Sequence, residues 1–160
     1  MVKIGLQIQA NLENVTDLIA KGEDFRWHLK LRCLNCGEET DKWQYLTEVE
    51  KSPLKGSRGE ASLVSKCKLC ARENSIDIVD DSKKAYSNDD KNKLKTIIVF
   101  DCRGFEPSAF EPRNGWIARG VDTGTQFNDI DLTEKEWVDY DEKLKEPVGI
   151  YDVTYKFVKL

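Results

Sequence analysis

The chain has 160 residues, of which 39% are hydrophobic and 34% are charged, so it contains enough apolar material for a folded core under a well-solvated surface. Its 29 acidic and 25 basic residues give a net charge of −4 at pH 7, which disfavours nucleic-acid binding because phosphates require an excess of basic groups. The first residues alternate instead of forming a continuous apolar run. We therefore expect neither a signal peptide nor a membrane span, and a cytoplasmic location with the nucleus as a second compartment.

Alternation of apolar and polar residues is the main structural pattern of the chain. Residues 2–12 place apolar side chains at every even position, which predicts a half-buried strand. After a turn at 21–24, the same alternation from Phe25 to Cys33 predicts a strand that ends at a cysteine. Similar patterns predict further strands beginning at Trp43, at 61–67, 75–79, 96–102, 125–132 and 151–157.

The remaining segments predict connections. Residues 80–95 are polar and charged, which favours a mobile connection between two halves, and Glu106 to Gly115 has the composition of a loop. Thr133, followed three residues later by Glu136, could form a capping box for one short helix. The expected fold class is therefore all-β, as a single domain over 1–160, with at most one or two short helical turns.

Four cysteines fall into two pairs of identical spacing, Cys33 with Cys36 and Cys67 with Cys70, separated by thirty residues. We call the turns 33–38 and 67–72 the first and second knuckle. A Cys-x-x-Cys turn directs two thiolates at one point, and two such turns complete the tetrahedral coordination that zinc prefers. Gly37 follows the first pair and suits a tight turn. The second pair lacks a glycine there, so its turn is less typical.

Three alternatives to a zinc site are open at this point. The cysteines could be unrelated buried residues, although two identical spacings argue against that. One pair could be a redox dithiol, but no helix start follows either pair. Disulfides are disfavoured because we expect a reducing compartment. The sequence favours one structural zinc, since four protein thiolates leave no open coordination position for catalysis.

An internal duplication is a further hypothesis. Superposing Cys33 on Cys102 aligns a strand that ends in a cysteine in both halves, and Trp137 and Tyr140 then match the second cysteine pair in spacing. We predict two pseudo-symmetric lobes, 1–80 and 96–160, of which only the first binds metal. Trp137 and Tyr140 would fill the equivalent corner with rings, and Cys102 would be a buried structural residue.

Other candidate residues point to surfaces more than to chemistry. His28, the only histidine, cannot supply a catalytic triad or a multi-histidine metal site, and we interpret it as a surface or packing residue. The acidic stretch 129–142 lacks the order of a calcium loop, which favours a solvated face or a partner surface. The segment 51–72 is basic and would offset the negative charge of a zinc–thiolate centre. No phosphate loop, dinucleotide motif or nucleophile elbow is present, so catalysis has little support.

Several stretches together resemble the eukaryotic CXXC-motif-containing zinc-binding proteins, a family of unknown function. They are GEDFRWHLKLRCLNCGE, DKWQYL, KGSRGEASLVSKCKLCARENSI, FDCRGFEP, WVDYDEK and VGIYDV, and the similarity extends from Ile4 to Val158. The resemblance implies an all-β fold of two related lobes with one zinc bound by Cys33, Cys36, Cys67 and Cys70. It also implies a monomeric cytosolic protein without known catalysis, linked to the heavy-metal-associated domains of copper chaperones.

Three functional hypotheses follow from the residues and the resemblance. The first is a non-catalytic zinc module that docks a protein partner. The second is a carrier that exchanges zinc or copper with a chaperone domain, although the chain has no Met-x-Cys-x-x-Cys copper loop of its own. The third is a thiol oxidoreductase in which one Cys-x-x-Cys pair cycles to a disulfide.

Overall fold

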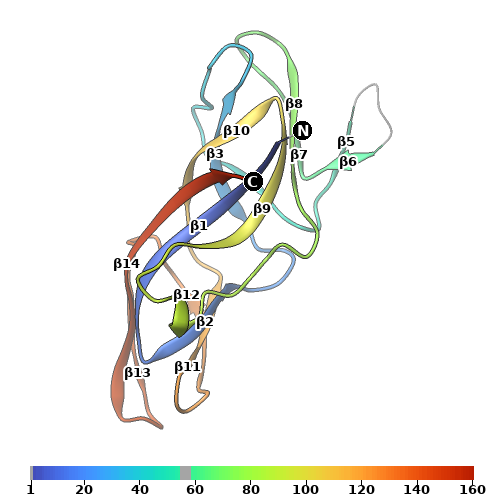
Figure 1. The fold of residues 1–160 in the computed structure, drawn as a ribbon. Helices are drawn as coiled ribbons and strands as arrows, with labels where there is room; N and C mark the ends of the chain where they lie inside the picture. The colour runs from blue at the N-terminus through green and yellow to red at the C-terminus, as the bar shows by residue number, and fades with distance from the viewer. Residues whose placement is uncertain (1, 55–58) are drawn as a thin grey trace.

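The structure is a computed structural model that describes residues 2–54 and 59–160, and most of these residues lie in β-strands (Figure 1). The first half contains β1 (Val2–Glu13), β2 (Val15–Ala20), β3 (Trp27–Cys33), β4 (Gln44–Leu46), β5 (Ser52–Pro53), β6 (Glu60–Ala61), β7 (Leu63–Lys66) and β8 (Glu73–Ile78). The second half contains η1 (Asn88–Asp90), β9 (Lys95–Arg103), β10 (Phe105–Glu111), β11 (Trp116–Gly120), β12 (Gln126–Ile130), β13 (Trp137–Asp141) and β14 (Glu146–Lys159). The predicted all-β class is confirmed.

The strands form one large sheet and three small ones. The six-stranded sheet has the order β13-β14-β1-β9-β8-β7, and all of its neighbouring strands are antiparallel. Two three-stranded sheets have the orders β10-β3-β4 and β12-β11-β2, and β5 pairs with β6 as a small hairpin. The first knuckle follows β3 in a small sheet, whereas the second knuckle joins β7 to β8 in the large one. The two knuckles therefore belong to different sheets.

Strand β1 is the central element of the large sheet. It pairs along most of its length with β14 on one side and with β9 on the other. Ile4 is opposite Lys159 of β14 and Phe100 of β9, so the two ends of the chain lie side by side. The predicted alternation is present, since Ile4, Leu6, Ile8, Ala10 and Leu12 are all buried.

The chain changes sheet at Gly104, between β9 and β10. Strand β9 pairs with β8 in the large sheet, and Ser75 forms a parallel bridge with Gly104 itself. The next residue, Phe105, is already paired with Cys33 of β3 in a small sheet. Gly104 has a φ of +83°, a left-handed conformation that favours glycine. This corner holds β3 and β8 next to each other.

One hydrophobic core extends through the molecule and includes buried side chains from both halves of the sequence. Its aromatic centre is formed by Phe25, Trp27, Phe110 and Trp116, in which Phe25 makes edge contacts with both tryptophans at centroid distances of 4.8 and 5.1 Å. The lobe boundaries 1–80 and 96–160 stay a prediction, because strands of both ranges share the large sheet and the core.

The specific corner predicted around Cys102 is wrong. Cys102 lies opposite Val2 at one end of β1, whereas Trp137 faces Ile150, which faces Leu12 at the other end. Ten residues along a strand correspond to roughly 33 Å. The ring of Trp137 packs on Phe127, and Tyr140 is 46% exposed. Matched sequence spacing therefore did not reflect matched positions in space. Cys102 itself is buried, as predicted for a structural residue.

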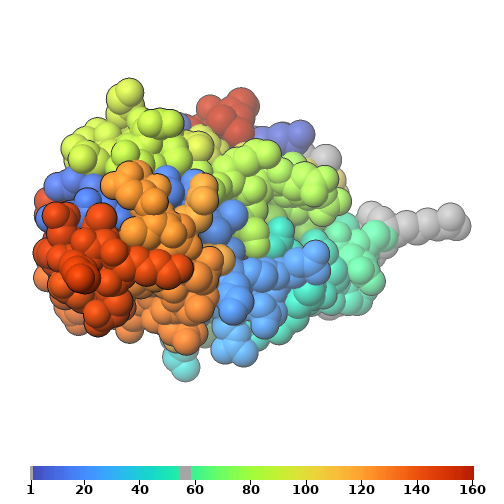
Figure 2. All heavy atoms as spheres, turned by 90° about the horizontal axis from the view of Figure 1, so that it is seen from below, coloured from blue at the N-terminus to red at the C-terminus, as the bar shows by residue number. Residues whose placement is uncertain are grey.

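Residues 80–95 were predicted as a mobile connection but are anchored to the fold. Tyr86 is fully buried, exchanges two backbone hydrogen bonds with Leu18, and donates its hydroxyl proton within a cluster of backbone oxygens that includes those of Asp90 and Lys93. Figure 2 shows this segment (yellow-green) packed against other parts of the chain. The polar composition of the segment suggested mobility, but the single buried residue Tyr86 anchors it.

The short helical turn also lies elsewhere than predicted. Residues after Thr133 form turns, whereas the 3-10 turn η1 is preceded by Ser87, whose N–H and hydroxyl both donate to Asp90. Across the described residues, no helix has the length and apolar character needed to cross a membrane. Residues 55–58, which include Lys55 and Arg58 of the basic segment, lie outside the described residues.

Strands β2 and β10 were missed because irregularities interrupt their alternation. Asp17 in β2 has a φ of +54°, and the β10–β3 register shifts between Pro107 and Ala109. Both features are β-bulges, which shift the inward-facing positions by one residue. Strand β13, which lies within the acidic stretch, was missed as well. It is an edge strand in which only the last residue, Asp141, is buried, so it has no series of buried apolar residues to mark it.

Asp141 is a buried carboxylate that ties two hairpins together. It accepts hydrogen bonds from the hydroxyls of Thr123 and Thr125 at 2.5 and 2.9 Å and from the N–H of Lys143 at 3.0 Å. The Thr123 hydroxyl is the main cause that holds the pKa of Asp141 below its usual value of 3.8. A lowered folded-state pKa means that the ionised carboxylate stabilises the fold above the ordinary pKa, and that this contribution is lost as the pH falls.

We predict that Asp141→Asn lowers the melting temperature at pH 7, because the amide nitrogen cannot accept these hydrogen bonds. The difference from wild type should shrink as the pH falls below the ordinary carboxyl pKa and through the lowered pKa of Asp141, because the wild-type carboxylate then protonates. Thermal melts followed by circular dichroism at several pH values measure both effects. Asp139→Asn, on the exposed face of the same strand, is the matched control and should change little. Equal melting of the two variants would contradict the role of Asp141.

Candidate metal centre

The first knuckle is built by the end of β3 and a tight turn. Strand β3 delivers Cys33 as a buried residue, and its N–H donates to the carbonyl of Glu38 at 2.9 Å. The N–H of Gly37 donates back to the carbonyl of Cys33 at 2.8 Å. Gly37 has a φ of +80°, a left-handed conformation that glycine adopts readily, so it forms the tight turn as predicted.

The second knuckle has the same two backbone hydrogen bonds. The N–H of Cys67 donates to Arg72, and the N–H of Ala71 donates to the carbonyl of Cys67, both at 2.9 Å. Ala71 takes the place of Gly37 and adopts a φ of +62°. The turn expected to be less typical is therefore the same turn, with an alanine in a left-handed conformation that costs about 1 kcal/mol.

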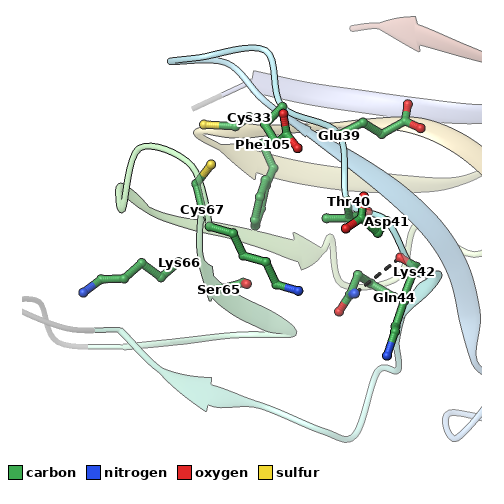
Figure 3. A pocket seen from close by; sticks show the side chains of 12 residues that line it. Cys33, Glu39, Thr40, Asp41, Lys42, Gln44, Ser65, Lys66, Cys67 and Phe105 are labelled. Carbon is green, nitrogen blue, oxygen red and sulfur yellow. Dashed lines mark hydrogen bonds between the residues drawn. The ribbon is translucent and has the colours of Figure 1, made fainter.

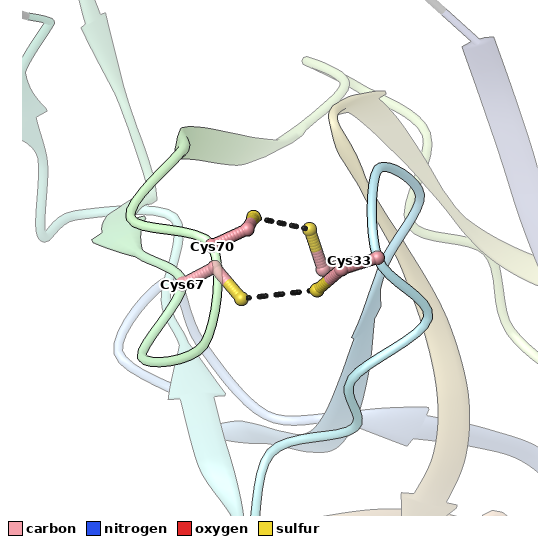
Figure 4. A group of neighbouring side chains, drawn as sticks. Cys33, Cys67 and Cys70 are labelled. Carbon is pink, nitrogen blue, oxygen red and sulfur yellow. Dashed lines mark hydrogen bonds between the residues drawn. The ribbon is translucent and has the colours of Figure 1, made fainter.

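The two knuckles bring all four predicted cysteines together, with every Sγ within 4.8 Å of every other (Figure 4). The Sγ atoms of Cys33 and Cys70 are 3.8 Å apart, and those of Cys36 and Cys67 are 3.5 Å apart. A Zn–S bond of about 2.3 Å in a tetrahedron requires sulfurs about 3.8 Å apart. The cluster is positioned to bind one metal ion of this kind.

The pKa values of the cysteine thiols also favour the binding of a cation. The backbone N–H of Cys36 lowers the pKa of Cys33 to about 6, and the Asn35 side chain lowers the pKa of Cys70. The Glu38 N–H favours the Cys36 thiolate, but loss of hydration and the neighbouring sulfurs outweigh it and raise that pKa to about 12. Four thiolates in so small a space repel each other, so a divalent cation is needed to hold them all ionised.

Asn74 is a functional residue that the sequence did not identify. Its side-chain amide is buried and donates from Nδ2 to the sulfur of Cys33 at 3.4 Å. Gly104 makes room for it, because a Cβ at this position would lie only 2.0 Å from the Asn74 Oδ1. The carbonyl of Gly104 also accepts the N–H of Leu34 at 2.9 Å. Contacts of this kind orient metal ligands.

We predict that Gly104→Ala weakens zinc binding and lowers the melting temperature, because the new methyl group displaces Asn74 from Cys33. Competition with a chromophoric chelator measures the affinity. Gly124→Ala is a matched control, since Gly124 has a similar φ of +69° but no atom within 4 Å of the added Cβ. If both variants bind zinc equally, Asn74 has no role in holding the ligand.

A groove of about 110 Å³ lies beside the centre, lined by Cys33 and Cys67 and floored in part by Phe105 (Figure 3). Its walls come from residues 38–42, at and after the end of the first knuckle, and from 65–68, where β7 leads into the second knuckle. The other two cysteines are more open, with Cys36 exposed and Cys70 partly exposed. The centre is therefore accessible from outside.

Of the other candidate residues, Cys102 and His28 lie outside the cluster, whereas part of the basic segment lies beside it. Cys102 is buried, and burial raises its pKa to about 12, which makes it an inert thiol. His28 lies five residues before Cys33 on β3, and alternation places it on the opposite face. In the basic segment, Lys51 pairs with Asp77 at 2.8 Å, whereas Lys66 and Lys68 line the groove.

Comparison with known proteins agrees with this geometry. A family model described as CXXC motif containing zinc binding protein, eukaryotic, matches residues 5–158. The chain is 58% identical over 159 residues to the CXXC motif containing zinc binding protein of Mus musculus and 57% identical to that of Homo sapiens, covering 99% of both sequences in each case.

Two solved structures share the fold. The crystal structure of C1orf123 superposes with a TM-score of 0.95 at 57% identity and covers 99% of both chains. A hypothetical protein from Plasmodium falciparum gives a TM-score of 0.89 at 26% identity, covering 99% of this chain and all of that one. The fold therefore persists when about three quarters of the aligned residues differ.

Proposed function

Because the chain belongs to the eukaryotic family of CXXC motif containing zinc binding proteins, we propose that it is a non-catalytic zinc protein that docks a protein partner. The observation that carries the proposal is the convergence of four cysteine sulfurs from two hairpins within 4.8 Å. Four thiolates complete the coordination of zinc and leave no position for substrate or water. The metal then serves structure and recognition.

The structural part of the proposal rests on where the knuckles lie. The first knuckle ends β3 in a three-stranded sheet, and the second joins β7 to β8 in the six-stranded sheet. A metal bound by both connects two sheets that otherwise meet through packing and through the corner at Gly104. Structural zinc contributes about 10 kcal/mol in zinc-finger peptides, which is comparable to the total stability of a domain.

We predict that removing zinc with a chelator lowers the melting temperature and loosens the knuckles first, because uncompensated thiolates repel each other. Metal analysis should find one zinc per chain in the wild type, and Cys67→Ser should lose it. Cys102→Ala, which removes the cysteine outside the cluster, should retain the zinc. An unchanged cooperative melt of the metal-free protein would contradict the structural role.

The docking part of the proposal rests on the tips of the knuckles. Leu34 and Leu69, the large residues inside the two Cys-x-x-Cys motifs, are 50% and 67% exposed. In the sequence they come shortly before the exposed Cys36 and the partly exposed Cys70. We call these four residues the knuckle-tip surface. Exposed apolar side chains gathered around a metal centre suit a partner that presents its own apolar surface.

The partner we propose is the heavy-metal-associated domain of a copper chaperone, which the family resemblance suggests. We predict that a Leu34→Ser, Leu69→Ser double variant keeps its zinc but binds such a domain about tenfold more weakly or worse, since both apolar contacts are lost. Titration of the labelled domain by NMR measures the affinity. Val138→Ser on β13, which is 64% exposed, is the matched control and should bind normally.

Two results would separate the parts of this proposal. If the double variant binds the domain as tightly as wild type, the knuckle-tip surface is not the docking site. If neither protein binds it while the zinc is retained, the partner is wrong and the structural role of the metal still stands.

A metal carrier is the second candidate, favoured by the exposure of Cys36. An exposed thiolate can be protonated and replaced first, which opens the site for exchange. A carrier should pass zinc to a heavy-metal-associated domain faster than to a small chelator of equal affinity. The oxidoreductase hypothesis gains less from the geometry, because the nearest sulfurs belong to different knuckles, Cys33 with Cys70 and Cys36 with Cys67.

A further inference from the structure

A second cavity, of about 520 Å³, opens between residues 21–28 and 113–115. It lies beside the first part of β3, roughly 17 Å along the strand from Cys33. Gly115 has a φ of +97°, and a Cβ there would lie 3.1 Å from the Phe25 ring, so only glycine allows the loop to rest on this ring. The N–H of Lys21 donates to the carbonyl of Gly115 at 3.0 Å and joins the two walls. The cavity is preformed.

Positive charge predominates in the lining of this cavity. Lys21, Arg26 and Arg113 contribute three cations, against the two carboxylates of Asp24 and Asp129. The lining therefore has one positive charge in excess, although the whole chain has a net charge of −4. A local excess of positive charge favours an anion over a cation.

The two guanidinium groups are held in place with hydrogen-bonding capacity to spare. Arg26 lies over the ring of Tyr45, with its guanidinium carbon 4.6 Å from the ring centre, and among the described residues it forms no ion pair. Arg113 uses its Nε to bind Glu111 at 2.9 Å. Its two terminal nitrogens make no hydrogen bond within the described part of the chain. Planar donors of this kind match the oxygens of a phosphate group.

His28 lines the same cavity, and the charges around the cavity shift its pKa. The imidazole Nδ1 is buried and has no hydrogen-bond partner among the described residues. Burial is the main cause that lowers the pKa of His28, and the positive charge of Arg113 is the next. The backbone of Arg26 and the negative charge of Glu111 oppose this lowering of the pKa, whereas the positive charge of the Arg26 side chain adds to it. The ring centre of Tyr45, on the neighbouring strand, is 6.1 Å from that of His28.

We propose that this cavity binds a small hydroxylated phosphate monoester of the sugar-phosphate class. The phosphate would lie between Arg26, Arg113 and Lys21. Three cations suit the double negative charge of a phosphate monoester better than the single negative charge of a carboxylate. Asp24 and Asp129 supply acceptors for the hydroxyl groups of the ligand. The cavity volume is within the range of small-molecule sites. The site is separate from the metal centre and does not depend on the function proposed above.

The single histidine makes the test direct, because its imidazole gives one unambiguous NMR signal. Zinc-loaded protein is titrated with glucose 6-phosphate, inorganic phosphate and glucose. We expect a saturable shift of His28 with the sugar phosphate, a weaker one with inorganic phosphate and none with glucose. The bound phosphate should also raise the pKa of His28, since its negative charge favours the imidazolium ion.

Variants identify the residues responsible. Arg26→Gln and Arg113→Gln should each weaken binding about tenfold or more, the loss expected for a charge-assisted hydrogen bond. Arg119→Gln, which removes an arginine paired with Asp17 outside the cavity, should bind normally. If either cavity variant fails to fold, Lys21→Gln replaces it.

Three outcomes would overturn the proposal. They are the absence of saturation up to about 10 mM sugar phosphate, undiminished binding by the cavity variants, and an equal response to glucose. A further internal check is that Arg113→Gln without ligand should itself raise the pKa of His28, because it removes a neighbouring positive charge.

Discussion

The corner at Gly104 is the constraint on which the metal centre depends. A single run of chain pairs with β8 before this residue and with β3 after it, so the strands that carry the two knuckles cannot separate unless one of these two ladders breaks. The left-handed backbone at Gly104 turns the chain, and its missing side chain leaves room for Asn74 beside the Cys33 sulfur. Sheet geometry thus determines the separation of the knuckles, and local hydrogen bonds determine the direction of each thiol.

The sequence predicted the features that are written in local patterns. The spacing of the cysteine pairs identified the four residues, since a Cys-x-x-Cys turn is closed by bonds within six residues, and strict alternation identified β1 and β3. Strands with bulges, such as β2 and β10, escaped because one extra residue reverses the alternation. Asn74 and Tyr86 escaped because their roles arise from distant partners, Cys33 and Leu18, which no local pattern reveals.

The two knuckles show how little of a metal site depends on residue identity outside the ligands. Gly37 and Ala71 occupy the same left-handed position and make the same hydrogen bond, although only one of them is suited to it. The cost at Ala71, about 1 kcal/mol, is small beside the free energy of structural zinc binding. A strongly bound ion therefore tolerates an unfavourable residue in the turn, provided that the sulfurs still meet.

The central position of β1 has a consequence for how the protein forms. The first strand of the chain gains one of its two partners only from the last strand, because β14 pairs with one edge of β1 and ends at Lys159. During synthesis, at roughly 5 to 20 residues per second, the 146 residues from the end of β1 to the end of β14 take about 7 to 30 s, and β1 lacks this partner for that time. Such long-range pairing makes folding slow and leaves an unpaired edge open to other chains. One edge of β1 in the nascent chain therefore stays unpaired until β14 has been synthesised.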